Sequence, residues 1–401
     1  MKKAILLLIV YICTNGIFAQ IKAGFWRFEL KNEGGNIPFN MELKEKNGSY
    51  KAYLLNSEER IELDNIKVNQ DSLHIPLHIF DASLLLKVSG NQMRGVYRKY
   101  FLNSDQELIG SFGEKYRFFE ESGKNKIDFS GKWAAEFSKT EGGKYPAIVL
   151  LNQKKNSNKI TGTIMTPTGD FRFLEGNVKN NELYLSTFDG GFAVLFKAHL
   201  ENEQLVGEFW SAKTKNATWV AKPDEKAQLP DADKITFLKE GYDKISFNFP
   251  NLEGKTVSLE DEKYKNKVVI LQIFGSWCPN CMDETAFLAK WYSKNKNKAI
   301  AIIGLAYERK PDFEYARQMV AKVVKRFSVE YDFVIAGVND KTAAQTLPML
   351  NGIFSYPTTI FIDKKGKVRK IHTGFSGPST GEYYQKWREE FNSLMNTLLK
   401  E

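Results

Sequence analysis

The feature that most constrains this chain is an apolar run that leads into two closely spaced cysteines. Val268–Phe274 is rich in β-branched and aliphatic residues, as expected of a strand buried on both faces. Cys278 and Cys281 follow, and the residue pattern of Met282–Lys294 predicts a helix. This order puts Cys278 at the helix N-terminus, where unpaired N–H groups and the helix dipole stabilise a thiolate. Cys281 is then close enough to attack a mixed disulfide that Cys278 has formed.

Two other roles are open to a Cys-x-x-Cys motif, half of a zinc site or a structural disulfide. Zinc would need a second pair of ligands at matching spacing. The chain has 3 Cys and 4 His, and the other cysteine and the histidines lie far from the motif. The context of the motif favours redox chemistry. We therefore predict no metal site and no cofactor beyond a redox-active disulfide Cys278-Cys281. His74 and His78, on one face of a predicted strand, are interpreted as ordinary strand residues.

The composition is that of a globular protein, with 42% apolar residues and a net charge of +9 over 401 residues. A chain of this length accommodates two or three domains. The positive charge would permit an anionic partner, but the lysines are spread along the chain among acidic residues. Nucleic-acid binding needs a clustered basic face, so no nucleic-acid partner is predicted.

The N-terminus has the pattern of a secretory signal peptide. Two lysines precede a short apolar run, and Ala19 offers a cleavage site. Residues 1–19 are therefore predicted to be removed, and no transmembrane span is predicted because the run is too short. Lipidation of Cys13 is the alternative, which the bulky Ile12 disfavours. The mature chain would keep only the paired cysteines, which indicates a periplasmic or otherwise exported protein because disulfides persist there.

Residues 20–222 show short alternating segments separated by Asn- and Gly-rich turns, which predicts an all-β region. The region contains an internal repeat, with copies at 20–122 and 128–222. Matching pairs are Gly24-Phe25-Trp26 with Gly131-Lys132-Trp133, Phe80-Asp81 with Phe188-Asp189, and Gly95-Val96-Tyr97 with Gly207-Glu208-Phe209. Each copy is predicted to be a small barrel or sandwich, and the Gly-x-Trp resembles the opening of lipocalin-like barrels. These units could bind a small apolar ligand or serve as a packed platform.

Residues 223–236 contain two prolines among polar residues and are predicted to be an extended linker. Residues 237–401 alternate strand and helix patterns and are predicted to be one α/β domain. Strands are predicted at Val268–Phe274, Ala299–Ala306, Thr358–Ile362 and Val368–His372, and helices at Met282–Lys294, Asp312–Arg326, Thr342–Asn351 and Thr380–Lys400. The first two strands should pair parallel and the last two antiparallel. We expect a mixed sheet with helices on both faces.

Three ordered motifs in this domain resemble the exported TlpA/ResA-type thiol-disulfide oxidoreductases, which have a thioredoxin fold. They are Phe247–Leu259, Phe274–Cys281 and Tyr356–Asp363. The resemblance covers about 245–401 and leaves the β repeats outside. It implies a cis bond before Pro357 and pairing of the Tyr356 backbone with an extended substrate. The implied docking surface consists of Trp277, Pro279, Tyr356 and Pro357.

The proton of the second thiol needs an acceptor. Thioredoxins carry a buried Asp six residues before the first cysteine, where this chain has Gln272. The TlpA/ResA relatives are similar in placing a Glu just after the next strand, and Glu308 fits that position. A half-buried carboxyl beside a thiol has a raised pKa and can act as a general base near neutral pH. The alternative for Glu308 is an ion pair with one of the two basic residues that follow it. Asp283 and Glu284 are interpreted as partners of the helix dipole.

The resemblance and the dithiol together predict an exported thiol-disulfide oxidoreductase that contributes to cell redox homeostasis. Cys278 would attack a disulfide in a client protein, Cys281 would resolve the mixed disulfide, and a membrane-borne electron donor would reduce the pair again. One alternative is a thiol oxidase or isomerase on the same fold, because Pro279-Asn280 does not set the potential. The other is a ligand-binding β protein with an accessory redox domain.

Overall fold

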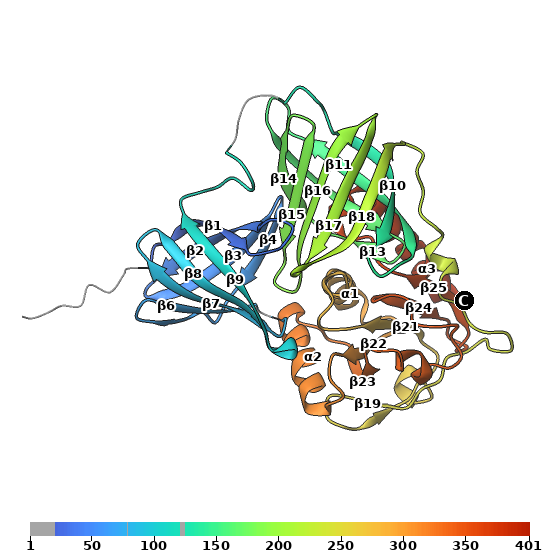
Figure 1. The fold of residues 1–401 in the computed structure, drawn as a ribbon. Helices are drawn as coiled ribbons and strands as arrows, with labels where there is room; N and C mark the ends of the chain where they lie inside the picture. Colours follow the sequence, from blue (N-terminus) through green and yellow to red (C-terminus); the bar gives the residue numbers. More distant parts are fainter. Residues whose placement is uncertain (1–20, 78, 121–124) are drawn as a thin grey trace, which may run out of the picture.

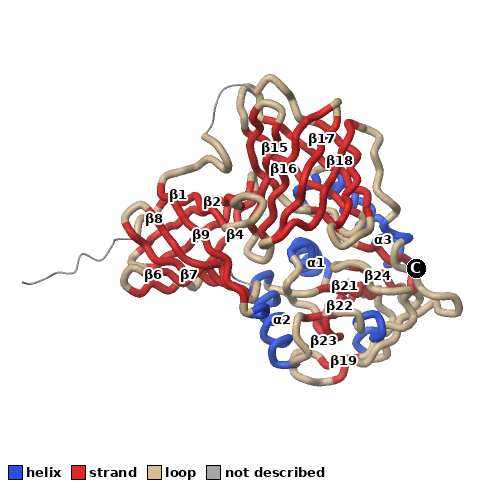
Figure 2. Tube along the Cα trace, in the orientation of Figure 1, coloured by secondary structure: helices blue, strands red, loops and turns tan. Residues whose placement is uncertain are grey.

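The computed structural model describes residues 21–77, 79–120 and 125–401, which form three parts (Figure 1). Two β units come first, and a domain with helices and strands follows (Figure 2). The predicted signal peptide, Cys13 and His78 lie outside the described residues. Within the part of the chain that is described, no helix is long and apolar enough to cross a membrane.

The first β unit is an open, antiparallel sheet in the strand order β4-β3-β2-β1-β9-β8-β7-β6-β5. Its strands are β1 (Gly24–Leu30), β2 (Ile37–Lys46), β3 (Ser49–Asn56), β4 (Glu59–Leu63), β5 (Lys67–Asn69), β6 (Ser72–Pro76), β7 (Ala82–Ser89), β8 (Gln92–Lys99) and β9 (Ser104–Phe112). The sheet forms a half-barrel, and the second unit supplies Phe188 and Leu195 to its core. The Phe39 and Phe188 rings lie 4.3 Å apart. The second unit therefore buries the apolar surface of the open sheet, which in a closed barrel would be buried by the sheet itself.

The second β unit is a closed, antiparallel barrel. Its strands are β10 (Gly131–Lys139), β11 (Lys144–Gln153), β12 (Lys159–Thr166), β13 (Gly169–Asp170), β14 (Leu174–Lys179), β15 (Glu182–Phe188), β16 (Ala193–Glu201), β17 (Gln204–Ser211) and β18 (Thr214–Pro223). The order runs β11-β10-β18-β17-β16-β15-β14-β12, and pairing of β11 with β12 closes the ring. The two-residue β13 pairs antiparallel with the end of β12. Inward side chains such as Phe196 and Trp219 fill the interior. The prediction of all-β units is confirmed, although only the second copy closes.

The repeat is visible in the hydrogen bonds of its two matching tryptophans. Trp26 Nε1 donates to the carbonyl of Lys22 at 3.0 Å. Trp133 Nε1 donates to the carbonyl of Phe129 at 3.2 Å. In both copies the acceptor lies four residues before the tryptophan. Both indoles are buried. Each first strand is therefore fixed by the same contact at the base of its unit.

The C-terminal domain has a five-stranded mixed sheet in the order β23-β22-β21-β24-β25. Its elements are β19 (Phe249–Pro250), β20 (Thr256–Val257), β21 (Val268–Phe274), α1 (Pro279–Asn295), β22 (Ile300–Glu308), α2 (Phe313–Phe327), β23 (Asp332–Val338), β24 (Thr358–Ile362), β25 (Val368–Thr373) and α3 (Glu382–Lys400). β21 and β22 pair parallel, and β24 and β25 pair antiparallel. Both pairings follow the prediction, and the architecture is that of a thioredoxin fold.

The helices share one face of this sheet, which corrects the expectation of helices on both faces. Side chains of α1, α2 and α3 pack in one cluster with Val268 and Ile270 of β21. The alternate residues of the same strand, Val269 and Leu271, pack on the lead-in from Ile245 and on residues near Leu350. The second face is thus covered by irregular chain.

The predicted helix Thr342–Asn351 is wrong, because only a 3-10 turn at Ala343–Thr346 forms there. Pro348 disfavours helical backbone in the residue before it, and Leu347 indeed has φ −128° and ψ 69°. The prediction also missed β23, which pairs parallel with β22. Its pattern of apolar residues is interrupted by Gly337, which hides the strand signal.

Candidate active site

The two cysteines lie where a buried strand meets a helix. β21 ends at Phe274, and α1 begins at Pro279, with Cys278 as its N-cap residue. Proline suits the first helical position because its missing N–H would have no partner there. The Cys281 N–H donates to Cys278 Sγ at 3.2 Å, so the sulfur takes the place of the usual capping oxygen. The helix start therefore directs a hydrogen-bond donor at the sulfur.

Both thiols are free and buried. Cys278 is 5% exposed and Cys281 is fully buried. Burial raises the pKa of the Cys281 thiol well above its ordinary value, and the charges of Cys278 and Glu284 raise it further. Cys278 is thus placed to meet a substrate, whereas Cys281 can lose its proton only with help from a neighbouring group.

The loop before β24 faces the first thiol. The Tyr356–Pro357 bond is cis. The Cys278 thiol donates to the Tyr356 carbonyl at 3.2 Å. Trp277 packs edge-on against the Tyr356 ring at 5.3 Å, and its Nε1 donates to the Tyr307 carbonyl at 2.9 Å. The structure therefore brings Trp277, Pro279, Tyr356 and Pro357 around Cys278.

Glu308 ends β22 and is fully buried. Its two oxygens accept from Ser276, one from the backbone N–H at 2.8 Å and one from the hydroxyl at 2.7 Å. Burial raises the pKa of Glu308 to about 7. Arg309 lies instead over the rings of Phe101 and Trp277, at 4.5 Å from each ring centre. Glu308 therefore holds the residue two positions before the first thiol.

A second buried carboxyl, Glu284, lies beside the second thiol and was missed as a site residue. It lies three residues after Cys281 on α1, which places the two on the same helix face. Its oxygens accept from Gln272 Nε2 at 2.8 Å and from Thr359 Oγ1 at 2.5 Å. Burial raises the pKa of Glu284 to about 7. Gln272, which stands where thioredoxins have a buried Asp, therefore binds the buried acid Glu284. The spacing of three residues between Cys281 and Glu284 on a predicted helix could have identified Glu284 as a site residue.

The interpretation of Asp283 and Glu284 as partners of the helix dipole is wrong. The first turn of α1 holds no acidic residue. Asp283 instead pairs with Arg172 of the barrel at 3.2 Å. Arg172 also donates to the carbonyl of Pro279 at 3.0 Å and to Glu59 of the half-barrel. One guanidinium therefore joins all three parts of the molecule at the start of the active-site helix.

The turn between β12 and β13 lies directly against the thiol region. The Ser355 hydroxyl donates to the Thr168 carbonyl at 2.7 Å. The Gly377 N–H donates to Asp170 at 2.7 Å. A Cβ on Gly374, where φ is +82°, would lie 2.8 Å from the carbonyl carbon of Thr168, so the backbone of this turn leaves room only for glycine there. The barrel thus packs on the first turn of α1, between the two cysteines.

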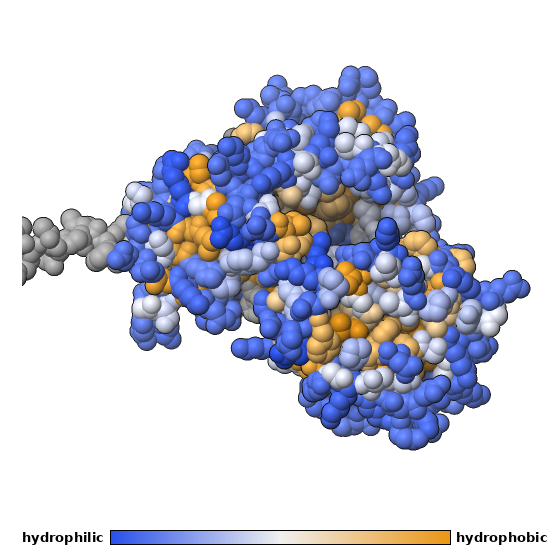
Figure 3. Space-filling view, turned by 60° about the horizontal axis from the view of Figure 1, so that its bottom comes forward, coloured by the Kyte–Doolittle hydropathy of each residue, from blue (hydrophilic) through white to orange (hydrophobic). Residues whose placement is uncertain are grey.

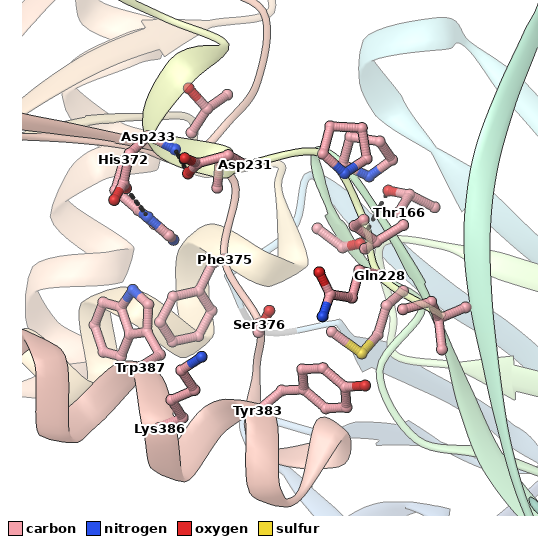
Figure 4. Close-up of a pocket in the computed structure, with 18 of the residues that line it drawn as sticks. Thr166, Gln228, Asp231, Asp233, His372, Phe375, Ser376, Tyr383, Lys386 and Trp387 are labelled. Atoms are coloured by element: carbon pink, nitrogen blue, oxygen red, sulfur yellow. Dashed lines mark hydrogen bonds and ion pairs between the residues drawn. The ribbon is translucent and has the colours of Figure 1, made fainter. Parts of the chain in front are cut away.

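A cavity of about 350 Å³ lies between the barrel and the Cys278 thiol. Trp277, Cys278 and Tyr356 form one wall, and the barrel forms the other. A different cavity of about 470 Å³ lies beside α3 and the 227–233 linker and contains neither thiol (Figure 4). There Asp233 accepts from His372 Nδ1 at 2.8 Å, which ties the linker to β25. We place the reaction in the first cavity because it contains Cys278.

No group of three or more His, Cys, Asp or Glu side chains in the described ranges is arranged to hold a metal ion. His74, assigned above as an ordinary strand residue, lies 2.9 Å from Ser83 Oγ through its Nε2. The predicted site residues outside the docking surface, Cys278, Cys281 and Glu308, all lie at the C-terminal ends of β21 and β22 or the start of α1.

Known proteins similar to this chain match its C-terminal part. The family model described as Redoxin matches residues 226–385. The thiol-disulfide oxidoreductase ResA of Bacillus thuringiensis subsp. konkukian is 33% identical over 137 residues, which are 33% of this chain and 71% of that protein. This chain belongs to the ResA family of thiol-disulfide oxidoreductases. ResA of Halalkalibacterium halodurans is 29% identical over 35% of this chain and 71% of its own length.

Among solved structures, a thiol:disulfide interchange protein of the thioredoxin family from Chlorobium tepidum is 18% identical over 40% of this chain and 98% of its own, with a TM-score of 0.31. The two β units lie before the Redoxin match. In this ResA-family protein, the β units therefore add walls to the thiol site that the matched region does not contain. Arg172 and the barrel residues carried no local sequence signal, because they reach the site only through the packing of the parts.

Proposed function

We propose that this protein is an exported reductase of disulfides in client polypeptides. The observation that carries the proposal is the position of Cys278 Sγ, 3.2 Å from the N–H of Cys281 and 3.2 Å from the carbonyl of Tyr356. A thiolate formed there keeps the N–H as a stabilising donor. It also lies beside a backbone carbonyl that an extended substrate can approach.

The reaction proceeds by two thiol–disulfide exchanges. Cys278 Sγ attacks one sulfur of the client disulfide, the client S–S bond breaks, and the second client sulfur leaves as a thiolate that takes a proton. Cys281 then attacks Cys278 Sγ, which releases the first client sulfur and leaves a Cys278–Cys281 disulfide. Two electrons have passed to the client, and a dithiol donor must return two to the protein.

Glu284 is the proposed acceptor of the Cys281 proton. Its pKa of about 7 suits exchange with a thiol near neutral pH. The prediction from sequence gave this role to Glu308, which has a similar pKa but holds Ser276, before the first thiol. Glu284 instead lies three residues after Cys281 on α1, and its charge raises the pKa of that thiol. We propose that Glu308 positions the loop before Cys278, while Glu284 moves the proton.

Export and the electron donor are parts of the same proposal. The signal-peptide pattern and the restriction of mature cysteines to one pair support a compartment in which disulfides persist. A membrane-borne dithiol donor would then supply electrons from the cytoplasmic side. Lipid attachment through Cys13 would keep the protein in the same compartment.

The reduction potential of the cysteine pair tests the direction of the reaction. The protein is equilibrated in thiol buffers of known potential, and the oxidised fraction is read from Trp277 fluorescence and from alkylation mass. A value of about −250 mV or lower supports a reductase. A value of about −120 mV would make the protein an oxidant and refute the proposed direction.

A further inference from the structure

The open end of the second barrel faces Cys278 across the 350 Å³ cavity. Leu183 and Leu185 of β15 point into the barrel core, and Thr187 continues the same alternation to the cavity. Val194 and Phe209 belong to the barrel core and also line the cavity. The cavity is therefore the mouth of the barrel interior, with the thiol across it. Figure 3 shows the surface hollowed where the barrel and the C-terminal domain meet.

A disulfide that Cys278 attacks must enter this cavity. Cys278 is only 5% exposed and lines the cavity with Trp277 and Tyr356. The backbone of Cys281 and the carbonyl of Tyr356 already occupy two directions around its sulfur. The incoming sulfur therefore approaches from the side on which the barrel lies, and the groups bonded to it contact the barrel mouth.

Ten residues of the barrel unit line this cavity, and four of them are apolar: Phe171, Phe192, Val194 and Phe209. The charged groups of the same wall already have partners. Arg172 pairs with Glu59 and Asp283, Asp170 accepts from Gly377 and Ser379, and Asp189 accepts from the N–H groups of Gly191 and Phe192. The wall therefore offers a substrate its four apolar side chains, together with the Thr187 hydroxyl and Arg172 Nε, which have no hydrogen-bond partner among the described residues.

The two walls match the two faces of an extended peptide. Successive side chains of a strand point to opposite sides. A cysteine directed at Cys278 therefore directs the side chains immediately before and after it toward the barrel mouth. A volume of about 350 Å³ lies at the small end of ligand cavities and admits a few residues, whereas a folded domain is excluded.

We propose that the mouth of the second barrel is the specificity pocket of the dithiol, and that it selects disulfides in extended polypeptide segments with an aromatic or branched aliphatic residue next to the cysteine. This inference rests on the proposed function and adds a substrate class to it. The bonds formed and broken are those of the two exchanges above. A dithiol reductant restores the pair, and dithiothreitol serves that purpose in the test.

The test uses the full-length reduced protein and short peptides whose single cysteine is disulfide-bonded to thionitrobenzoate. Three peptides carry Phe at the position after cysteine, Asp at that position, or Phe one residue further on. We expect kcat/KM to be at least about tenfold higher for the first peptide than for the other two, the factor that burial of one large apolar side chain supplies. Equal values for the three peptides would overturn the proposed pocket.

Matched variants locate the preference on the barrel. Phe192 is half-buried in the turn between β15 and β16, so Phe192→Glu should abolish the preference without removing a core side chain. Phe192→Leu should retain it. Val220→Glu adds the same charge to an exposed position of β18, where Val220 is 43% exposed, and should also retain it. A preference that survives Phe192→Glu would overturn the assignment.

A small disulfide without side chains separates this inference from the proposed function. Reduction of 2-hydroxyethyl disulfide should proceed at similar rates in the parent protein and in the Val220→Glu variant, whose substitution lies outside the cavity. If that disulfide is reduced but the peptides are not distinguished, the pocket is wrong and the reductase stands. If neither is reduced, both proposals fail.

Discussion

Replacement of Arg172 by methionine should destabilise the fold in a pH-dependent manner. The guanidinium is buried and binds Glu59, Asp283 and the Pro279 carbonyl. Loss of one partner from a buried ion pair costs about 3–5 kcal/mol. Because 17% of the Asp283 side chain is exposed, we take the lower end, about 3 kcal/mol.

The pH dependence follows from Asp283. Burial, together with the charge of Glu59, raises its pKa to about 7, while Arg172 opposes the rise. The native state therefore holds a proton that the unfolded state loses near pH 4, and stability falls as pH rises toward 7. Without Arg172 the native pKa rises further, so the fall continues above pH 7. Each further pH unit adds about 1.4 kcal/mol, or about 2 kcal/mol at pH 8.5.

Urea unfolding of the parent and of Arg172→Met at pH 5.5 and 8.5, followed by tryptophan fluorescence, measures both the pH-independent loss of stability and the additional loss at high pH. The comparison is repeated in an Asp283→Asn background, where the pH-independent loss should remain and the additional loss at pH 8.5 should shrink. It should not vanish, because Arg172 also lowers the pKa values that burial raises at Asp170 and Asp189. An equal loss at the two pH values, or an additional loss that Asp283→Asn leaves undiminished, would refute the reasoning.

Three further results are expected. Glu284→Gln should slow resolution of the mixed disulfide by about 10²-fold or more and remove a rise in the rate of resolution near pH 7, measured by stopped flow. Glu308→Gln should keep that rise. The opposite pattern would restore the acceptor role to Glu308. Cys281→Ser should accumulate the mixed disulfide with peptide substrates, visible by intact mass, and its absence would contradict the two-step exchange. Gly374→Ala would place a Cβ 2.8 Å from the Thr168 backbone, so it should push the barrel turn off the thiol region and speed alkylation of the first thiol several-fold. Gly142→Ala, with a similarly positive φ but nothing within 4 Å, is its control, and equal rates would argue against a barrel seated on the thiols.

The first β unit shows what a repeat predicts and what it cannot. Matching residues such as Trp26 and Trp133 do make the same contact in both copies. Closure differs nonetheless, because Phe188 of the second copy fills the core of the first. Whether a sheet closes depends on what else can bury its open side, and that partner lies far away in the sequence.

The sequence by itself determined the fold of the C-terminal domain and the position of the dithiol. Those signals are local: an apolar strand, two cysteines at a helix start and a Tyr-Pro dipeptide each lie within a few residues. Only the tertiary structure decided that the helices share one face, that Glu284 lies beside Cys281 and that a barrel mouth covers Cys278. Arg172 and Pro279 are 107 residues apart and meet where two parts of the molecule pack together, and such contacts leave no periodic pattern in the chain.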